Sequence, residues 1–191
     1  MCRQSKRYVC IDTVLQHGIL RIQPFSIGDG DMIFIILGTQ KFQMNRLLIL
    51  VDDLIADGEL STAVVAQIGQ SDYEPKHFSF YRFLDKHDFD RLVSDASIII
   101  THGGVSSIIT AIKCGKPVVV FPRLKKYGEH VDNHQREIAH VFEKKGFVIC
   151  CDEGDDFMAK VALAKAKEFY RYVSQTDNIS QIINDYLARH F

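Results

Sequence analysis

Short segments made mostly of apolar residues recur along this chain. They alternate with longer segments whose apolar residues are spaced as in a helix. Five of the short segments have the length of a strand: 32–38 ("MIFIILG"), 61–69 ("STAVVAQIG"), 97–101 ("SIIIT"), 117–122 ("PVVVFP") and 147–152 ("FVICCD"). Strands that are apolar throughout are typical of a parallel sheet whose two faces are both covered by helices. The alternation therefore predicts an α/β fold: a doubly wound, mostly parallel, Rossmann-like sheet with helices on both faces.

The segments between these strands carry apolar residues at helical spacing. The expected helices are 45–58, 86–96, 105–115, 132–146, 154–173 and 178–190. Three of them end at a glycine, which is a common stop signal for a helix. The aromatic-rich stretch 77–85 is expected to be a short strand or a loop.

The first 31 residues differ from the rest of the chain. They have no sustained periodicity and end in a cluster of glycine and aspartate. We expect residues 32–191 to form one domain and residues 1–31 to be an extension outside it. Two readings of this extension are open: a genuine part of the protein, or upstream sequence joined to a chain that starts naturally at Met32, which we favour.

Composition and charge argue against several classes of protein. The net charge is −1, whereas nucleic-acid-binding domains are usually basic, although "PRLKKYG" is a local basic run. No apolar run reaches the roughly 18 residues of a membrane span, and no apolar leader follows Met1. The five cysteines are odd in number and contain no C-x-x-C pair, so neither a disulfide framework nor a zinc site is indicated. We expect a reduced, cytoplasmic protein.

Glycines and polar residues occur where three of the predicted strands end, in 37–40 ("LGTQ"), 67–70 ("QIGQ") and 101–104 ("THGG"). Ligands of doubly wound sheets bind outside these carboxyl ends. The helix after 101–104 would aim its free N–H groups at the same edge, with the hydroxyls of Ser106 and Ser107 as further donors. A phosphate or pyrophosphate suits this arrangement. The alternative is a tight strand–helix turn, because neither G-x-G-x-x-G nor a P-loop lysine is present.

A longer stretch carries a more specific pattern. The segments "DASIIITHGGVSSIITAIKCGKPVVVFPR" and "EHVDNHQREIAHVFEKKGFV" resemble the C-terminal, donor-binding half of MurG-type GT-B glycosyltransferases, the glycosyltransferase family 28 C-terminal domain. Small split subunits built from that half alone are nearer still. They include the nucleotide-sugar subunit of a two-chain UDP-N-acetylglucosamine transferase. The PssE- and EpsF-like exopolysaccharide glycosyltransferases match best, through "LGTQ", "QIG" and "FPRLKKYGEHVDNHQ".

The resemblance implies that the chain binds a UDP-sugar. It assigns residues to four parts of the donor site: Gly103, Gly104, Ser106 and Ser107 to the diphosphate; Asn133, His134 and Gln135 to the sugar or phosphate; Gly38 and Thr39 to the cleft where donor and acceptor meet; and Arg123 to the path of the chain past the base.

One position departs from the MurG-type pattern. Where most members carry a glutamate that binds the ribose hydroxyls, this chain has Thr110, which can hydrogen-bond a hydroxyl but offers no carboxylate. We interpret this as a difference between branches of the family. The resemblance also implies a partner: a membrane-anchored chain that binds a lipid-linked sugar acceptor and recruits this chain to the inner face of the cell membrane.

Glycosyl transfer needs stabilisation of the leaving UDP, a general base for the acceptor hydroxyl, and alignment of both substrates. The candidates for the base are His102, His130 and His134, each with an intrinsic pKa near neutrality. We assign a catalytic role to His102 first. In full-length relatives the base comes from the other half, so the partner is the alternative source.

Metal binding is the competing interpretation of "EHVDNH", where His130 and His134 stand four residues apart, near Glu129 and Asp132. Such a pair can ligate zinc from one helical face. The stretch lies at a loop–helix junction and is not H-E-x-x-H, and the GT-B relatives use no catalytic metal. We therefore expect no metal and no cofactor besides the UDP-sugar substrate.

Three functions follow from these features. The first is a UDP-sugar-dependent glycosyltransferase subunit that transfers a hexose in exopolysaccharide or capsule synthesis, together with a membrane-anchored partner. The second is a non-catalytic nucleotide-sugar-binding subunit that regulates such a complex. The third, a nucleotide-sugar 2-epimerase, is disfavoured because that enzyme needs both halves of the fold in one chain.

Overall fold

The structure, a computed structural model, describes residues 31–172. Six parallel strands form one sheet in the order β3-β2-β1-β4-β5-β6. The strands are β1 (Met32–Ile36), β2 (Ala63–Gln67), β3 (Ser79–Tyr81), β4 (Ile98–Thr101), β5 (Val118–Val120) and β6 (Ile149–Cys150). This order and direction confirm the doubly wound, Rossmann-like sheet predicted from the sequence.

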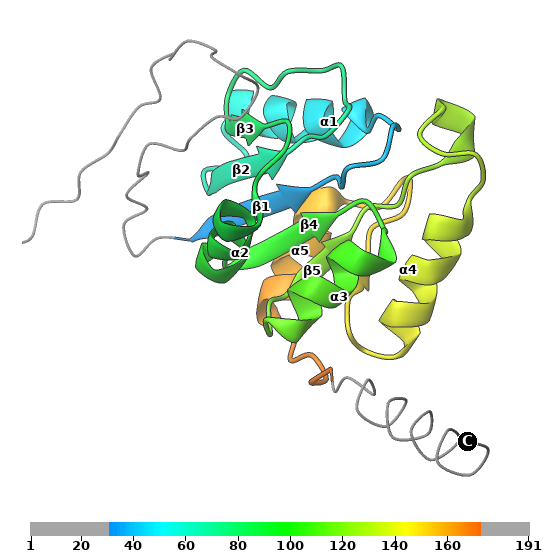
Figure 1. The fold of residues 1–191 in the computed structure, drawn as a ribbon. Helices are drawn as coiled ribbons and strands as arrows, with labels where there is room; N and C mark the ends of the chain where they lie inside the picture. The colour runs from blue at the N-terminus through cyan, green and yellow to red at the C-terminus, as the bar shows by residue number, and fades with distance from the viewer. Residues whose placement is uncertain (1–30, 173–191) are drawn as a thin grey trace, which may run out of the picture.

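Helices cover both faces of the sheet, as Figure 1 shows. They are α1 (Asn45–Ala56), α2 (Lys86–Asp95), α3 (Val105–Lys113), α4 (His134–Lys144) and α5 (Phe157–Ala166), with a short 3₁₀ turn, η1 (Lys125–Tyr127). Within the described residues, none of these helices has the length and apolar content that a membrane crossing requires.

The apolar strands divide their side chains between two cores. Ile33 and Ile35 of β1 pack with α1 and α5 on one face. Phe34 and Ile36 pack with α2, α3 and α4 on the other. Because neighbouring residues of a strand point to opposite faces, only a strand that is apolar at every position can serve both cores. This explains the continuous apolar runs in the sequence.

The expected helix 154–173 is wrong at its carboxyl end. Helix α5 stops at Ala166, and residues 167–172 have no regular structure. Tertiary contacts override the helical pattern there: the Tyr170 N–H donates to the Gly146 carbonyl (3.3 Å), and Tyr172 packs edge-on against Phe147. The expected helix 178–190 and the first 30 residues of the proposed extension lie outside the described residues.

The buried carboxylate of Asp52 fixes the loop between β2 and β3. It projects from α1 and accepts hydrogen bonds from the Tyr73 hydroxyl (2.6 Å) and from the backbone N–H groups of Lys76 (3.0 Å) and His77 (2.8 Å). Burial alone would raise the pKa of this carboxyl, but the hydrogen bonds outweigh burial and lower the pKa below its usual value.

The lowered pKa of Asp52 predicts a pH-dependent contribution to stability. A carboxyl whose pKa is lower in the folded state stabilises the fold above its unfolded pKa of about 4, and this contribution disappears as the pH falls through the folded pKa. Asp52→Asn should lower the free energy of unfolding by about 2 kcal/mol at pH 7. Urea unfolding at pH 7 and pH 3 should show that the difference in free energy of unfolding between the wild type and Asp52→Asn is smaller at pH 3. Asp53→Asn, on the exposed side of α1, is the control and should change little at either pH.

Candidate functional site

A pocket of about 850 Å³ opens at the carboxyl ends of β1, β2 and β4, where α2, α3 and α4 approach the sheet edge. The ends of β1 and β4 are level, because Ile36 pairs with Thr101. Ten of the twelve site residues predicted from the sequence line the pocket: Gly38, Thr39, His102, Gly103, Gly104, Ser106, Ser107, Thr110, His134 and Gln135. Two, Arg123 and Asn133, are not part of the lining.

His102 lines the pocket and is held between two glycines. Its Nδ1 lies 3.0 Å from the Ile36 carbonyl oxygen. A Cβ atom on Gly38 would lie 2.8 Å from the His102 Cε1, and one on Gly104 would lie 2.5 Å from Nε2. Side chains at either glycine would therefore collide with the ring. With Nδ1–H donating to the carbonyl, Nε2 is a hydrogen-bond acceptor on the Gly104 side.

Burial changes the chemistry expected of His102. The ring is 5 % exposed. This burial, with the nearby positive charge of Arg123, lowers the pKa of His102 to about 4. In the folded chain the pKa of His102 thus lies well below its intrinsic value near neutrality. His102 is neutral at physiological pH, so it is a weak base but a ready acceptor for a hydroxyl proton.

The low pKa of His102 gives a direct test by NMR. The ring proton resonance that disappears in His102→Gln should keep a constant shift from pH 5.5 to pH 8 and should move only as the pH approaches 4. The physical reason is that protonation would place an unpaired charge in a buried site next to Arg123. A midpoint near the ordinary value of about 6.5 would contradict this environment.

The amino end of α3 faces the pocket with unsatisfied N–H groups. Its N-cap is Gly104, which provides no side-chain cap, and its first turn contains no acidic residue. Ser106 is exposed and Ser107 half-buried in that turn, and Thr110 follows one turn later on the pocket wall. Free N–H groups, the positive end of the helix dipole and two hydroxyls make this a suitable place for a phosphate.

Gln135 brings an unpaired polar group to the same pocket from the amino end of α4. Its side chain is 7 % exposed, and its Oε1 has no hydrogen-bond partner among the described residues. Buried polar atoms are nearly always paired, so a hydrogen-bond donor from a ligand would complete this site. Asn133, two residues earlier, supports the loop before α4 instead, because its Oδ1 accepts the backbone N–H of Lys125 (3.0 Å).

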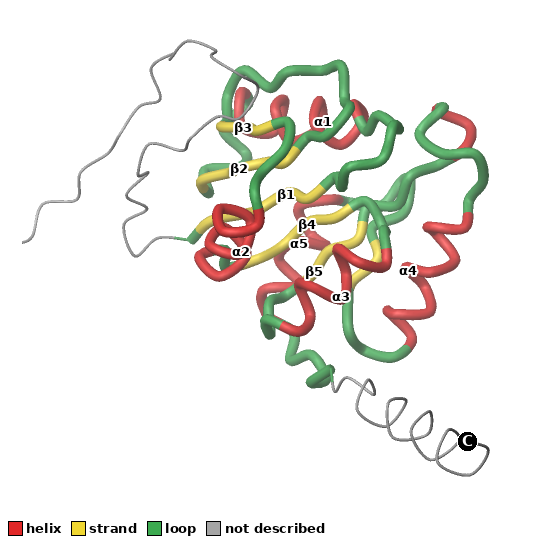
Figure 2. Tube along the Cα trace, in the orientation of Figure 1, coloured by secondary structure: helices red, strands yellow, loops and turns green. Residues whose placement is uncertain are grey.

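Arg123 supports the pocket from outside it. The side chain is 1 % exposed, and Nη2 donates to the carbonyls of Leu37 (2.9 Å) and Phe42 (2.8 Å). Figure 2 shows the backbone of the loops that follow β1 and β5 at this edge of the sheet. The hydrogen bonds of Arg123 join these two loops. Arg123 is thus not among the residues that line the pocket, and its expected place beside a nucleotide base stays a prediction. Its guanidinium positions the loop that carries Gly38 and Thr39.

The sequence reasoning missed one whole wall of the pocket. Helix α2 and the loop before it contribute Leu84, Asp85, Lys86, Phe89 and Asp90. Asp85 carried a signal, since aspartate before an apolar-periodic segment is a typical N-cap, and its carboxylate accepts the Asp88 N–H (2.8 Å). A helix whose amino end lies beside the sheet edge brings its first turn to the pocket.

The alternative metal site at His130 and His134 is not assembled in the structure. His130 Nδ1 lies 2.9 Å from Asp132, and His134 Nδ1 lies 3.3 Å from Glu137. Glu129 is occupied by an ion pair with Arg46. Among residues 31–172, the groups of three potential metal ligands that lie close together include neither histidine.

Comparison with known proteins places these features in a family. Two curated relatives are each called "UDP-N-acetylglucosamine transferase subunit ALG13". The one from Mus musculus is 29% identical over 127 residues, which is 62% of this chain and 10% of the relative. The one from Candida albicans is 31% identical over 108 residues, which is 56% of this chain and 29% of the relative. The chain thus spans less than a third of either relative.

Solved structures share the fold at low sequence identity. The glycosyltransferase of kitacinnamycin superposes with a TM-score of 0.56 at 17% identity, over 83% of this chain and 40% of that one. The calicheamicin glycosyltransferase CalG4 superposes with a TM-score of 0.56 at 16% identity, over 76% of this chain and 36% of that one. Residues 32–168, which include the whole pocket, match the glycosyltransferase family 28 C-terminal domain, and the chain belongs to that family.

Proposed function

We propose that this chain binds a UDP-sugar in the pocket and forms the donor-binding half of a glycosyltransferase whose second half is another chain. The observation that carries the proposal is the convergence of two incomplete hydrogen-bonding groups. The free N–H groups at the amino end of α3 need an acceptor, and the buried Oε1 of Gln135 needs a donor. A diphosphate bonded to a hydroxylated sugar offers both.

The geometry suggests a role for each part of the pocket. The α3 amino end with Ser106 and Ser107 stabilises the diphosphate, and more so as negative charge grows on the departing UDP. Gln135 accepts a sugar hydroxyl proton. The neutral Nε2 of His102 accepts another, in a place where a protonated ring would be poorly tolerated. Thr110, on the second turn of α3, is the candidate for a ribose contact.

A general base of ordinary strength is expected from the partner rather than from His102. At a pKa of about 4, His102 draws a proton from a hydroxyl weakly at neutral pH. An acceptor has to reach the donor in this pocket for transfer to occur. We propose that a membrane-anchored partner presents a lipid-linked sugar there and supplies the base, so this chain works at the inner face of the membrane.

The sequence motifs also suggest a biological setting for this transfer. The motifs "LGTQ" and "FPRLKKYGEHVDNHQ" support hexose transfer in exopolysaccharide or capsule synthesis, as in the PssE- and EpsF-like subunits. The names of the two curated relatives make UDP-N-acetylglucosamine the first donor to test. UDP-glucose and UDP-galactose are the comparison donors: glucose differs from N-acetylglucosamine only at C2, and galactose differs in addition by the configuration at C4.

Ligand-observed NMR tests donor binding. Saturation transfer should appear for UDP, but not for ADP, GDP or TDP at equal concentration. Gly104→Trp, which fills the pocket beside His102, should abolish it. Lys113→Ala, at the exposed far end of the same helix, should leave it intact. If the isolated chain gives no UDP signal, the experiment is repeated on the complex purified with its partner, and silence there would overturn the proposal.

The low pKa of His102 also favours a second candidate, a subunit that binds the nucleotide sugar without taking part in transfer. The two candidates differ in the effect of Gln135→Ala within an intact complex. If the chain holds the reacting donor, transfer should fall by a factor of about 10–100 for the loss of a buried hydrogen bond to the sugar. If the chain only regulates its partner, the basal rate should not change.

A further inference from the structure

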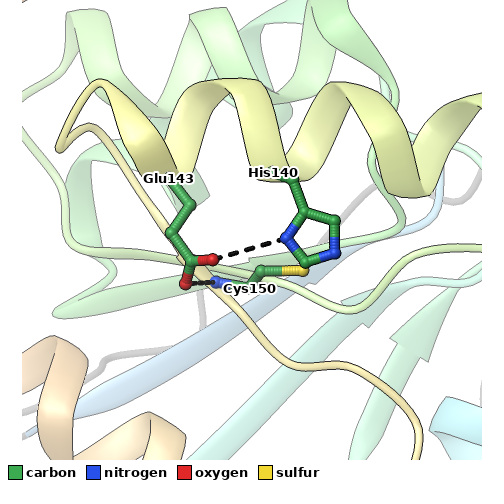
Figure 3. Close-up of side chains that lie close together, drawn as sticks. All are labelled: His140, Glu143 and Cys150. Carbon is green, nitrogen blue, oxygen red and sulfur yellow. Dashed lines mark hydrogen bonds and ion pairs between the residues drawn. The ribbon is translucent and has the colours of Figure 1, made fainter.

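Three potential metal ligands meet outside the pocket, where α4 passes the edge strand β6. His140 and Glu143 project from the same side of α4, one turn apart, toward Cys150 at the end of β6 (Figure 3). The His140 Nδ1 lies 3.5 Å from a Glu143 carboxylate oxygen. One ligand atom from each of the three residues lies within 4.8 Å of those of the other two.

Each of these side chains is already oriented by a further contact. The other carboxylate oxygen of Glu143 accepts the backbone N–H of Cys150 (2.7 Å), so the carboxylate bridges the helix and the strand. The His140 Nε2 lies 2.9 Å from Asp152, and Arg136 in turn donates to Asp152 (2.9 Å). A carboxylate behind the far nitrogen of a histidine is the usual outer partner of a metal-bound imidazole.

We propose that His140, Glu143 and Cys150 form a binding site for a thiophilic divalent cation, with Zn²⁺ as the first choice. In tetrahedral zinc sites, nitrogen and oxygen ligands lie about 3.4 Å apart and nitrogen and sulfur about 3.6 Å apart, given the usual bond lengths. The observed 3.5 Å between His140 and Glu143 already matches. The sulfur needs a shift of about 1 Å at most, within reach of a side-chain adjustment.

The charges and the burial of the three residues suit such an ion. A thiolate and a carboxylate balance the two positive charges of the cation, and Arg136 balances Asp152. Binding forms a metal–sulfur bond and releases the thiol proton to solvent. Cys150 is buried, whereas His140 and Glu143 are partly exposed, so the ion has an entry path from solvent. A thiol also selects zinc over magnesium or calcium, which prefer oxygen.

The site would join the donor pocket to the edge of the sheet. Helix α4 begins with His134 and Gln135, which line the pocket, and continues through His140 and Glu143. A cation shared with Cys150 would tie this helix to β6. The alternative is an ion network without metal, in which a protonated His140 bridges Glu143 and Asp152.

Cobalt substitution tests the proposal on the full chain. Co²⁺ added to the reduced, metal-free protein should give intense visible bands typical of tetrahedral coordination and a near-ultraviolet thiolate-to-cobalt band, saturating at one equivalent. Zn²⁺ should displace it. Cys150→Ser should abolish the thiolate band. Cys151→Ser is the matched control, because Cys151 is equally buried but packs on the opposite face of the sheet, and it should keep the band.

Two further variants keep the test decisive if Cys150→Ser folds poorly. His140→Gln lies on the partly exposed side of α4 and should remove a ligand without disturbing the core. Asp152→Asn should keep all three ligands and weaken Co²⁺ binding by about 10–100-fold through the loss of the outer carboxylate. A thiolate band that persists in His140→Gln, or no band in the wild-type chain at excess Co²⁺, would overturn the site and leave the metal-free ion network as the explanation.

Discussion

Glu129→Gln is expected to lower the free energy of unfolding by about 3 kcal/mol, the lower end of the usual cost of breaking a buried ion pair, because the Arg46 side chain is 23% exposed. Glu129 is 0 % exposed. Its two oxygens accept from the Arg46 Nε (3.1 Å) and Nη2 (2.9 Å), and one of them also accepts the Leu124 backbone N–H (2.9 Å). A neutral amide of the same shape would turn an N–H group toward these donors.

The loss would extend to Arg123, since the charge of Glu129 opposes the effect of burial on that guanidinium. Burial lowers the pKa of Arg123 to about 10, and Glu129 acts in the other direction. Without Glu129, two cationic side chains would share the region with no buried anion. The loops after β1 and β5 would lose the charge balance that holds them together, so UDP binding should weaken along with stability.

Urea unfolding of the two proteins measures this effect, with Glu137→Gln as the control. Glu137 also forms an ion pair, with His134 (3.3 Å), but both side chains are largely exposed to solvent. Exposed pairs contribute little, so this variant should change the free energy of unfolding by less than about 0.5 kcal/mol. If both variants lowered the free energy of unfolding equally, the burial of Glu129 would not be the reason for its contribution to stability.

The sheet and the position of the pocket were predictable because both depend on local patterns. A run such as "SIIIT" can be buried on both faces only in a covered parallel sheet, and glycines at strand ends mark close approach of the chain. Since parallel strands all end at the same edge, residues 37–40 and 101–104 had to meet there whatever their separation in the sequence. This is why most predicted site residues line one pocket.

The directions of the charged side chains were not predictable in the same way. Because Arg123 follows β5, its backbone must lie at the edge of the sheet. Its side chain, however, could point either into the pocket or into the protein interior. It points inward because the carbonyls of Leu37 and Phe42, which belong to the loop after β1, accept its hydrogen bonds there, and because the buried Glu129 of its own loop attracts its charge. The pKa of His102 likewise depends on how deeply the fold buries the ring, which no local pattern reports.

Gly104→Ala is expected to weaken UDP binding by about 10–100-fold, although it adds a single methyl group. The backbone of Gly104 has φ −67° and ψ 127°, which alanine adopts freely, so strain in the main chain plays no part. The methyl group would lie 2.5 Å from the His102 Nε2. The His102 ring would have to move and give up its hydrogen bond to the Ile36 carbonyl. Overpacking of this kind costs about 1–3 kcal/mol.

A double variant separates the clash inside the protein from a clash with the ligand. His102→Ala removes the ring and opens space for the new methyl group. If the collision with His102 is the cause, Gly104→Ala should be harmful in the wild-type chain and nearly neutral in the His102→Ala background, with dissociation constants for UDP measured by calorimetry. If the methyl group instead collides with bound UDP, the loss should be the same in both backgrounds. The second outcome would mean that Gly104 is needed to leave space for UDP, and that contact with His102 does not explain the effect of the substitution.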